Sequence, residues 1–172
     1  MRTIFNKRRE NENDLRIHRN TEGTIFEIAV LFLIILMWIA AVLIYRHSPE
    51  TIPTHFDLKG NPNGYSSRST LFIIAAIGTA ISAIMLASAY APSRRFNMPG
   101  KITTFRQQWL MARMMRILAV VIALLLIDSM FMTAHPGNRI VVYVMMALVA
   151  LLFILPLYFT IRAGLMKKQQ KN

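Results

Sequence analysis

Residues 28–45 read IAVLFLIILMWIAAVLIY and contain no charged side chain. An α-helix of about 20 residues, with a rise of ~1.5 Å per residue, matches the ~30 Å hydrocarbon core of a lipid bilayer. Three further apolar runs of spanning length follow along the chain. The sequence therefore predicts an all-α membrane protein with four transmembrane helices, at about 25–45, 71–90, 110–134 and 140–161.

The composition also favours a membrane protein over a soluble domain. Hydrophobic residues make up 55% of the 172 residues and charged residues 16%, whereas soluble domains carry about 25% charged residues. The net charge of +12 would suggest nucleic-acid binding in a soluble protein. Here the cations flank the apolar runs, which membrane topology explains, so we expect no nucleic-acid partner. The chain has no cysteine, which excludes disulfides, thiolate metal sites and a cysteine nucleophile.

The distribution of Lys and Arg predicts the orientation in the membrane. Sixteen of the 20 lie in the N-terminal tail, in the second connection with the start of the third helix, and in the C-terminal tail. Because cytoplasmic segments carry the excess of cations, we expect both termini in the cytoplasm, with the helices in the plasma (inner) membrane. The predicted layout is a basic tail at 1–24, one membrane domain at 25–165 with an outer loop at 46–70, and a second basic tail at 166–172.

Two sequence patterns predict helix starts. Thr24-Ile25-Phe26-Glu27 fits a capping box, in which Thr24 accepts from the backbone and Glu27 reaches back to the cap. Glu27 is therefore interpreted as structural rather than catalytic. Thr104 with Gln107 offers a second capping box before the third helix.

Charged residues within or near the third span need an explanation. Its first part contains three arginines, Arg106, Arg113 and Arg116. Their long side chains are expected to extend back to the lipid headgroups. Asp128 lies deeper, where an ionisable residue costs about 2.5–3.5 kcal/mol on insertion scales. It is predicted to be an intramembrane polar site with a cationic or histidine partner. The candidate partners are His47, Arg68, His135 and Arg139.

The outer loop has an internal pattern of its own. Its side chains alternate from residue 51 to residue 57, which predicts a short strand resting its apolar edge on the helices. One side carries Ile52, Thr54 and Phe56, and the other carries Pro53, His55 and Asp57. The sequence Gly60-Asn61-Pro62-Asn63-Gly64 is typical of a turn. Tyr65-Ser66-Ser67 is the candidate partner strand, so the loop is predicted to form a short β-hairpin.

This loop resembles a known family. The pattern Ile52-Pro53-x-His55-Phe56-Asp57-x-x-Gly60-x-Pro62-x-Gly64-Tyr65-x-x-Arg68 is similar to the signature of a bacterial membrane family of unknown function (DUF1648). That domain also forms the N-terminal part of SdpI-type immunity proteins, which protect their producer from a secreted peptide toxin and take part in signalling. Those proteins carry further membrane helices after this domain. The resemblance implies family-motif residues that could contact a ligand, namely Pro53, His55, Phe56, Asp57, Gly60 and Gly64.

Two interpretations of the polar residues in the motif remain open. His55 and Asp57, two residues apart on a strand, would point the same way and, with Asp128, could hold Zn²⁺. Alternatively, His55 forms a hydrogen bond within the loop and Asp57 caps the turn. We favour the second interpretation because the spacing matches no recognised metal signature.

The leading functional hypothesis is a non-enzymatic membrane protein related to SdpI-type proteins. Its outer loop would act in toxin immunity or envelope signalling, with a peptide toxin or another membrane protein as partner beside the lipid bilayer. We expect no catalytic residues, no cofactor and no bound metal. The alternatives are an outer-face metal-binding protein or metal-dependent enzyme built on His55, Asp57 and Asp128, and a small transporter or assembly subunit.

Overall fold

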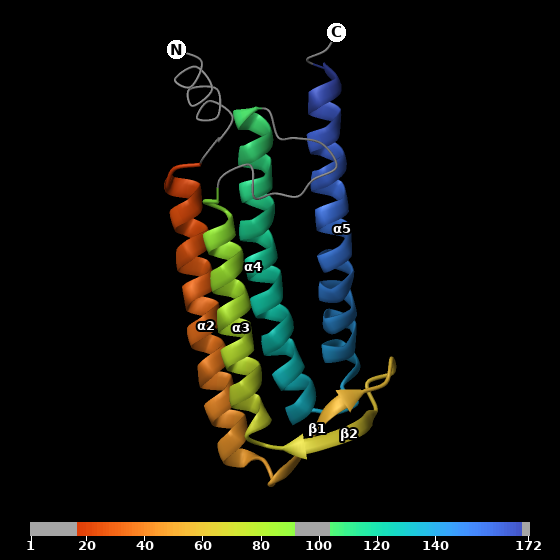
Figure 1. The fold of residues 1–172 in the computed structure, drawn as a ribbon. Helices are drawn as coiled ribbons and strands as arrows, with labels where there is room; N and C mark the ends of the chain where they lie inside the picture. Colours follow the sequence, from red (N-terminus) through yellow and green to blue (C-terminus); the bar gives the residue numbers. More distant parts are fainter. Residues whose placement is uncertain (1–16, 92–103, 170–172) are drawn as a thin grey trace, which may run out of the picture.

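The computed structural model describes residues 17–91 and 104–169, and Figure 1 shows its fold. The parts of the predicted tails at 1–16 and 170–172, and most of the second connection, lie outside the described residues. The elements, in chain order, are α2 (Thr21–His47), β1 (Thr51–Phe56), β2 (Pro62–Ser67), α3 (Thr70–Ser88), α4 (Phe105–Ala134) and α5 (Arg139–Gln169). All four helices are long and apolar enough to cross a membrane. The predicted fold class, four spanning helices with an ordered loop between the first two, is confirmed.

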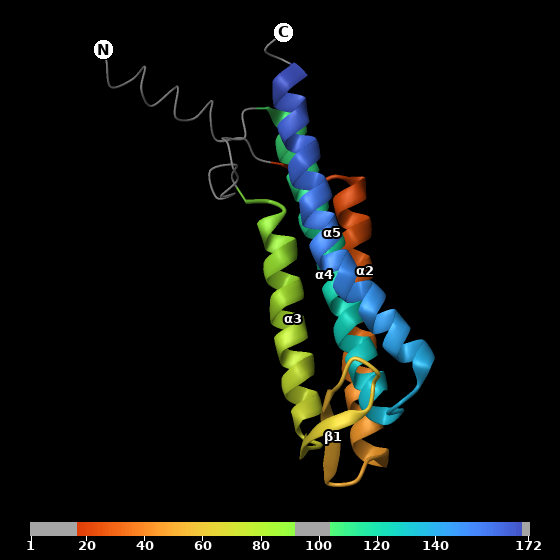
Figure 2. The same ribbon diagram turned by 90° about the vertical axis from the view of Figure 1, so that its right-hand side faces the viewer.

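The helix α4 is the centre of the bundle. It packs against each of the other three helices, and it has more buried residues than any other described helix. The helix α5 packs mainly on α4, and its buried contacts gather toward its C-terminal half, where Phe159 and Ala163 join Leu110 and Met114 in one apolar cluster. Figure 2 shows the N-terminal part of α5, in lighter blue, turning away from the axis of its other half. Pro156 lies inside this helix and removes one backbone hydrogen bond there.

Small residues on α3 allow close packing against its neighbours. Ala75, Gly78 and Ser82 are buried on one face of the helix. A Cβ added to Gly78 would lie 2.7 Å from Leu126 and 2.8 Å from Met37, so α4 and α2 both approach the glycine backbone. Such small-residue faces are the usual way in which membrane helices come into close contact.

The start of α2 differs from the prediction. The helix begins at Thr21, and its cap is Asn20, whose side chain accepts a hydrogen bond from the Gly23 N–H at 2.8 Å. The predicted capping box at Thr24 is therefore wrong, because Asn is the stronger cap and stands one turn earlier. Thr24 donates its hydroxyl to the Asn20 carbonyl instead.

The second predicted helix start, at Thr104, agrees with the structure. The Thr104 side chain accepts from the backbone of Gln107, while the Gln107 side chain accepts from the backbone of Thr104, which completes the capping box before α4. Asn138 precedes α5, and its side chain accepts from the Ile140 N–H at 3.0 Å.

The loop between α2 and α3 is an antiparallel two-stranded hairpin. Thr51 pairs with Ser67, and Pro53 pairs with Tyr65, but the register shifts on both sides of His55. Ile52 is buried, whereas Thr51, Tyr65 and Ser67 are exposed. The predicted alternation is thus confirmed for the first part of the strand.

The hairpin lies at one end of the bundle, and the first and last described residues of the chain lie toward the other. In Figure 1 the hairpin covers the lower end, while the start of α2 and the end of α5 lie toward the upper end. This arrangement puts both described chain ends on one side of the membrane. Which side is cytoplasmic stays a prediction from the cation distribution, as do the boundaries of the single membrane domain and its tails.

Candidate functional site

The hairpin is fixed to the bundle by an apolar side chain. Ile52 is 2% exposed and belongs to a core cluster that includes Met37, Leu71 and Met130, one from each of α2, α3 and α4. Burying a side chain of this size contributes about 1.5–3 kcal/mol. The base of the hairpin therefore moves with the helices rather than as a free loop.

Backbone contacts fix the far end of the hairpin. Gly60 adopts a φ of +82°, and its carbonyl accepts a hydrogen bond from the Gly137 N–H, between α4 and α5, at 3.1 Å. A Cβ on Gly60 would lie only 2.2 Å from Cγ2 of Val142 on α5. Glycine is required here for two reasons, the left-handed backbone and the close approach of α5.

Arg68 closes the base of the hairpin. Its guanidinium lies 4.5 Å from the centre of the Tyr45 ring and donates to the carbonyl of Ser48 at 3.1 Å. Its backbone N–H donates to the carbonyl of Glu50 at 2.9 Å. These contacts join the end of α2 to the residues that precede α3.

Asp57 builds the turn, as the second sequence interpretation proposed. Its Oδ1 accepts from the N–H groups of Lys59 and Asn61, both at 2.8 Å, and its Oδ2 accepts from the Asn61 side chain at 3.0 Å. The side-chain hydrogen bond from Asn61, supported by the two backbone N–H groups, lowers the pKa of the Asp57 carboxyl below its usual value. The main role of the Asp57 carboxylate is therefore to stabilise the turn.

The remaining motif residues divide between structure and surface. Pro53 lies on an edge strand, where its missing N–H costs little. Gly64 leaves room for His55, because a Cβ on Gly64 would lie 3.0 Å from the His55 Cβ. His55 is exposed and Phe56 is half-buried, and both line a cavity under the hairpin. No hydrogen bond involving the His55 side chain is found among the described residues, so that part of the structural interpretation is not supported.

The described residues contain no group of three His, Cys, Asp or Glu side chains arranged to hold a metal ion. His55, Asp57 and Asp128 are therefore not brought together as the metal hypothesis required. Asp128 is half-buried in α4, and its buried Oδ2 has no hydrogen-bond partner among the residues that the structure describes. Within the described residues no ion pair joins it to any of the four candidate partners.

Two cavities adjoin beneath the hairpin, and together we name them the hairpin groove. One, the apolar compartment, has a volume of about 530 Å³ and lies between β1, α4 and α5. The other, the polar compartment, has a volume of about 480 Å³ and lies between the turn and the start of α5. The two share Leu58, Val142 and Met146 in their walls, so they lie side by side. The sequence did not predict this groove, because its walls come from distant segments.

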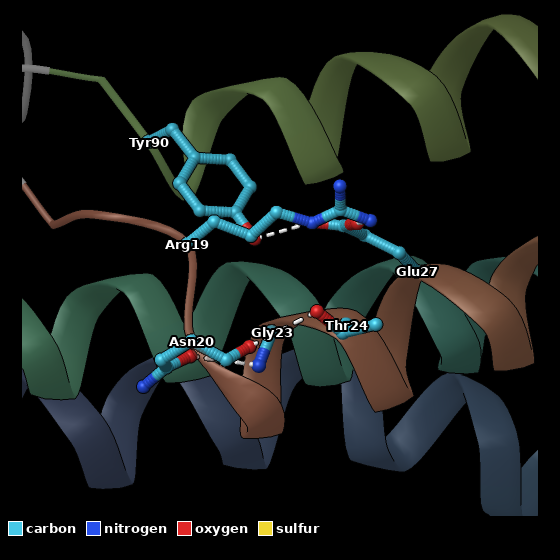
Figure 3. A network of polar contacts seen from close by, with 6 residues as sticks. All are labelled: Arg19, Asn20, Gly23, Thr24, Glu27 and Tyr90. Atoms are coloured by element: carbon cyan, nitrogen blue, oxygen red, sulfur yellow. Dashed lines mark hydrogen bonds and ion pairs between the residues drawn. The ribbon is translucent and has the colours of Figure 1, made fainter.

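A polar network occupies the opposite end of the bundle (Figure 3). Tyr90, two residues beyond α3, donates a hydrogen bond to Glu27 on α2, and Arg19 forms an ion pair with the same carboxylate. Glu27 is thus structural, as predicted, although it does not complete a capping box. Arg113 forms a second ion pair, with Glu22, at 2.9 Å.

Arg116 differs from its predicted position at the lipid headgroups. It is completely buried, and its guanidinium lies 5.2 Å from the centre of the Tyr90 ring. A Cβ on Gly23 would lie 2.8 Å from Nη2 of Arg116, so glycine in α2 provides the space. The expected extension to the headgroups is wrong because the side chain points into the bundle, where Tyr90 and Gly23 receive it.

The comparisons with known proteins concern the segment that contains the hairpin. Residues 32–79 match the model of a family described as a domain of unknown function, DUF1648. The match covers 48 of the 172 residues of the chain. It comprises most of α2, the hairpin and the first half of α3, so the resemblance drawn from the motif is confirmed.

The chain also resembles an uncharacterized protein of Archaeoglobus fulgidus. The two are 41% identical over 56 residues, which cover 33% of this chain and 31% of the relative. The match thus spans about a third of each protein. No solved structure matches the chain.

Proposed function

We propose that this protein is a non-enzymatic membrane protein that recognises a factor outside the membrane through the outer face of its hairpin. The outer face consists of two cross-strand pairs, Thr51 with Ser67 and Pro53 with Tyr65. Both pairs lie on the side of the hairpin opposite the buried Ile52. By analogy with SdpI-type proteins, the recognised factor is a secreted peptide, and recognition serves immunity or envelope signalling.

The observation that carries the proposal is an exposed aromatic ring on a fixed support. Tyr65 is 62% exposed and lies on the side of the hairpin opposite the buried Ile52. Exposed tyrosines on rigid elements are frequent anchors of protein interfaces. The hairpin is held at its base by Ile52 and at its far end by Gly60, so binding to Tyr65 would order little additional chain.

A toxin-protection assay tests the proposal. The wild-type protein is produced in a bacterium that is sensitive to a panel of secreted antimicrobial peptides, and inhibitory concentrations are measured against cells with an empty vector. We expect protection against at least one peptide. Tyr65→Ala should abolish the protection while leaving the amount of protein in the membrane unchanged.

Tyr143→Ala is the matched control. Tyr143 is exposed to a similar degree, 67%, but it lies on α5 and lines the polar compartment of the hairpin groove. Its variant should retain protection if the outer face of the hairpin is the recognition surface. Equal sensitivity of producing and empty-vector cells to every peptide in the panel would contradict the proposal, as would equal losses in the two tyrosine variants.

A further inference from the structure

The hairpin groove combines two chemically different compartments. The walls of the apolar compartment include Met132 on α4 and Met145, Val149 and Ala150 on α5, all within helices long enough to span a membrane. This is the region where α5 turns away from the bundle (Figure 2), and among the described residues of α5 only Val142 is buried in its first half. The compartment is thus an apolar space open at membrane depth.

The polar compartment carries positive charge that the neighbouring residues compensate only in part. Lys59 from the hairpin turn and Arg139 from the start of α5 both line it, together with Tyr143. Neither cation forms an ion pair within the described residues. The one nearby carboxylate, Asp57, already accepts three hydrogen bonds from Lys59 and Asn61. An anion in this compartment would therefore meet two cations whose charges the turn only partly offsets.

We propose that the hairpin groove holds one anionic phospholipid from the leaflet at the hairpin end. Its acyl chain fills the apolar compartment, and its phosphate lies between Lys59 and Arg139 in the polar compartment. The two spaces adjoin at Leu58, Val142 and Met146, which places a headgroup site directly beside a site for its acyl chain. Cations at a membrane surface attract anionic lipids in the same way.

A lipid fits the groove better than a peptide segment does. A peptide backbone placed in the apolar compartment would bring N–H and C=O groups that need partners. The polar side chains of α4 there, Ser129 and Thr133, already donate to the carbonyls of Leu126 and Ser129 in their own helix. An acyl chain has no such requirement. The proposal goes beyond recognition by the outer face of the hairpin, because no residue of that face lines the groove.

Native mass spectrometry of the full chain in detergent tests the charge component. Phosphatidylglycerol and phosphatidylcholine with identical acyl chains are added separately, and the fraction of protein with one bound lipid gives each affinity. We expect phosphatidylglycerol to bind more tightly. Lys59→Gln and Arg139→Gln should each weaken its binding about fivefold, and the double variant about 20-fold. Arg46→Gln, an exposed cation at the end of α2 that does not line the groove, should have no effect.

A second pair of variants tests the apolar compartment. Ala150→Phe places a ring in it and should weaken the binding of both lipids at least tenfold, whereas Ala147→Phe, one turn away on α5 and outside the lining, should not. A thermal melt of each variant verifies that it is folded.

Three outcomes would overturn the proposal. They are equal affinities for the two lipids, equal losses in Arg46→Gln and in the double cation variant, and full lipid binding in folded Ala150→Phe. Retention of the lipid in a protein without toxin protection would reject the proposed function and leave this inference standing.

Discussion

The two ends of the bundle differ in how their charged side chains are accommodated. At the end where α2 begins, Arg19, Glu27 and Tyr90 contact one another, and Arg116 is enclosed beside them. At the hairpin end, Lys59 and Arg139 face a groove and have no acidic ion-pair partner within the described residues. The first end is closed by side chains, and the second leaves room for a molecule that is not part of the chain.

The difference follows from what joins the segments at each end. Long charged and aromatic side chains bridge α2, α4 and the residues after α3 at the first end. At the hairpin end Arg68 and Tyr45 join α2 to the start of α3, but the turn reaches the start of α5 through a glycine carbonyl and a glycine N–H. Backbone contacts bring the turn to α5 without filling the space beneath it, so a groove remains. The hairpin end is thus the better candidate for function.

The largest effect is expected from filling the space at the glycine bridge. Gly60→Ala places a Cβ 2.2 Å from the stiff side chain of Val142 and forces a side-chain residue into a φ of +82°. Left-handed strain of about 1–2 kcal/mol and overpacking of about 1–3 kcal/mol should together lower the free energy of unfolding by about 2–5 kcal/mol. Thermal denaturation in detergent, together with proteolysis of the hairpin, measures the loss.

Gly137→Ala separates the two contributions. Gly137 also has a positive φ, +79°, but a Cβ there would have no atom within 4 Å. It should therefore cost only the strain, about 1–2 kcal/mol. Equal losses in the two variants would show that α5 does not press against the turn, and the contrast between the two ends would lose its basis.

Much of this architecture could be predicted from the sequence because it depends on local signals. The length of the apolar run at 28–45 predicts a spanning helix, and the alternation around Ile52 predicts a strand with one buried face. Asp57 was correctly interpreted as a turn residue because its donors, Lys59 and Asn61, are its neighbours in the chain.

The features that the sequence did not predict depend on how distant segments meet. Lys59 and Arg139 are far apart in the sequence, so no local pattern shows that they line one cavity. The enclosed position of Arg116 depends on the rotation of α4 toward Tyr90 and Gly23. The count of Lys and Arg predicts which side of the membrane a segment occupies. Whether one of these side chains is buried in the bundle depends on how the helices pack.

The next largest effect should distinguish Arg116 from the paired cations at its end of the bundle. All three nitrogens of its guanidinium are buried, and none has a hydrogen-bond partner of good geometry among the residues that the structure describes. Its contact with Tyr90 compensates by only about 0.5–2 kcal/mol. Replacing buried charged groups by apolar ones of similar size is often stabilising by about 1–4 kcal/mol. Arg116→Met should therefore raise the free energy of unfolding by about 1–3 kcal/mol, measured by thermal denaturation.

Arg113→Met is the control for this stabilisation. Arg113 lies on the same helix, but its side chain is partly exposed and paired with Glu22, so its removal should change stability by less than about 1 kcal/mol. A destabilised Arg116→Met variant would mean that the enclosed guanidinium contributes more to the bundle than its contacts with Tyr90 and Gly23 suggest.

The smallest effect concerns pH and is confined to the hairpin turn. Hydrogen bonds from Asn61 and the backbone of Lys59 lower the pKa of Asp57 from its ordinary value of 3.8. A lowered pKa in the folded state means that the carboxylate stabilises the turn at pH values above about 4, and that this contribution is lost as the pH falls through the lowered pKa. Amide hydrogen exchange at Lys59 and Asn61 should therefore show reduced protection at acidic pH relative to the backbone of α4. In Asp57→Asn this pH dependence should disappear. The oxygen of the asparagine side chain can accept hydrogen bonds from the same backbone N–H groups, but this side chain does not titrate. Persistence of the pH dependence in Asp57→Asn would assign it to another group and remove Asp57 from the comparison of the two ends.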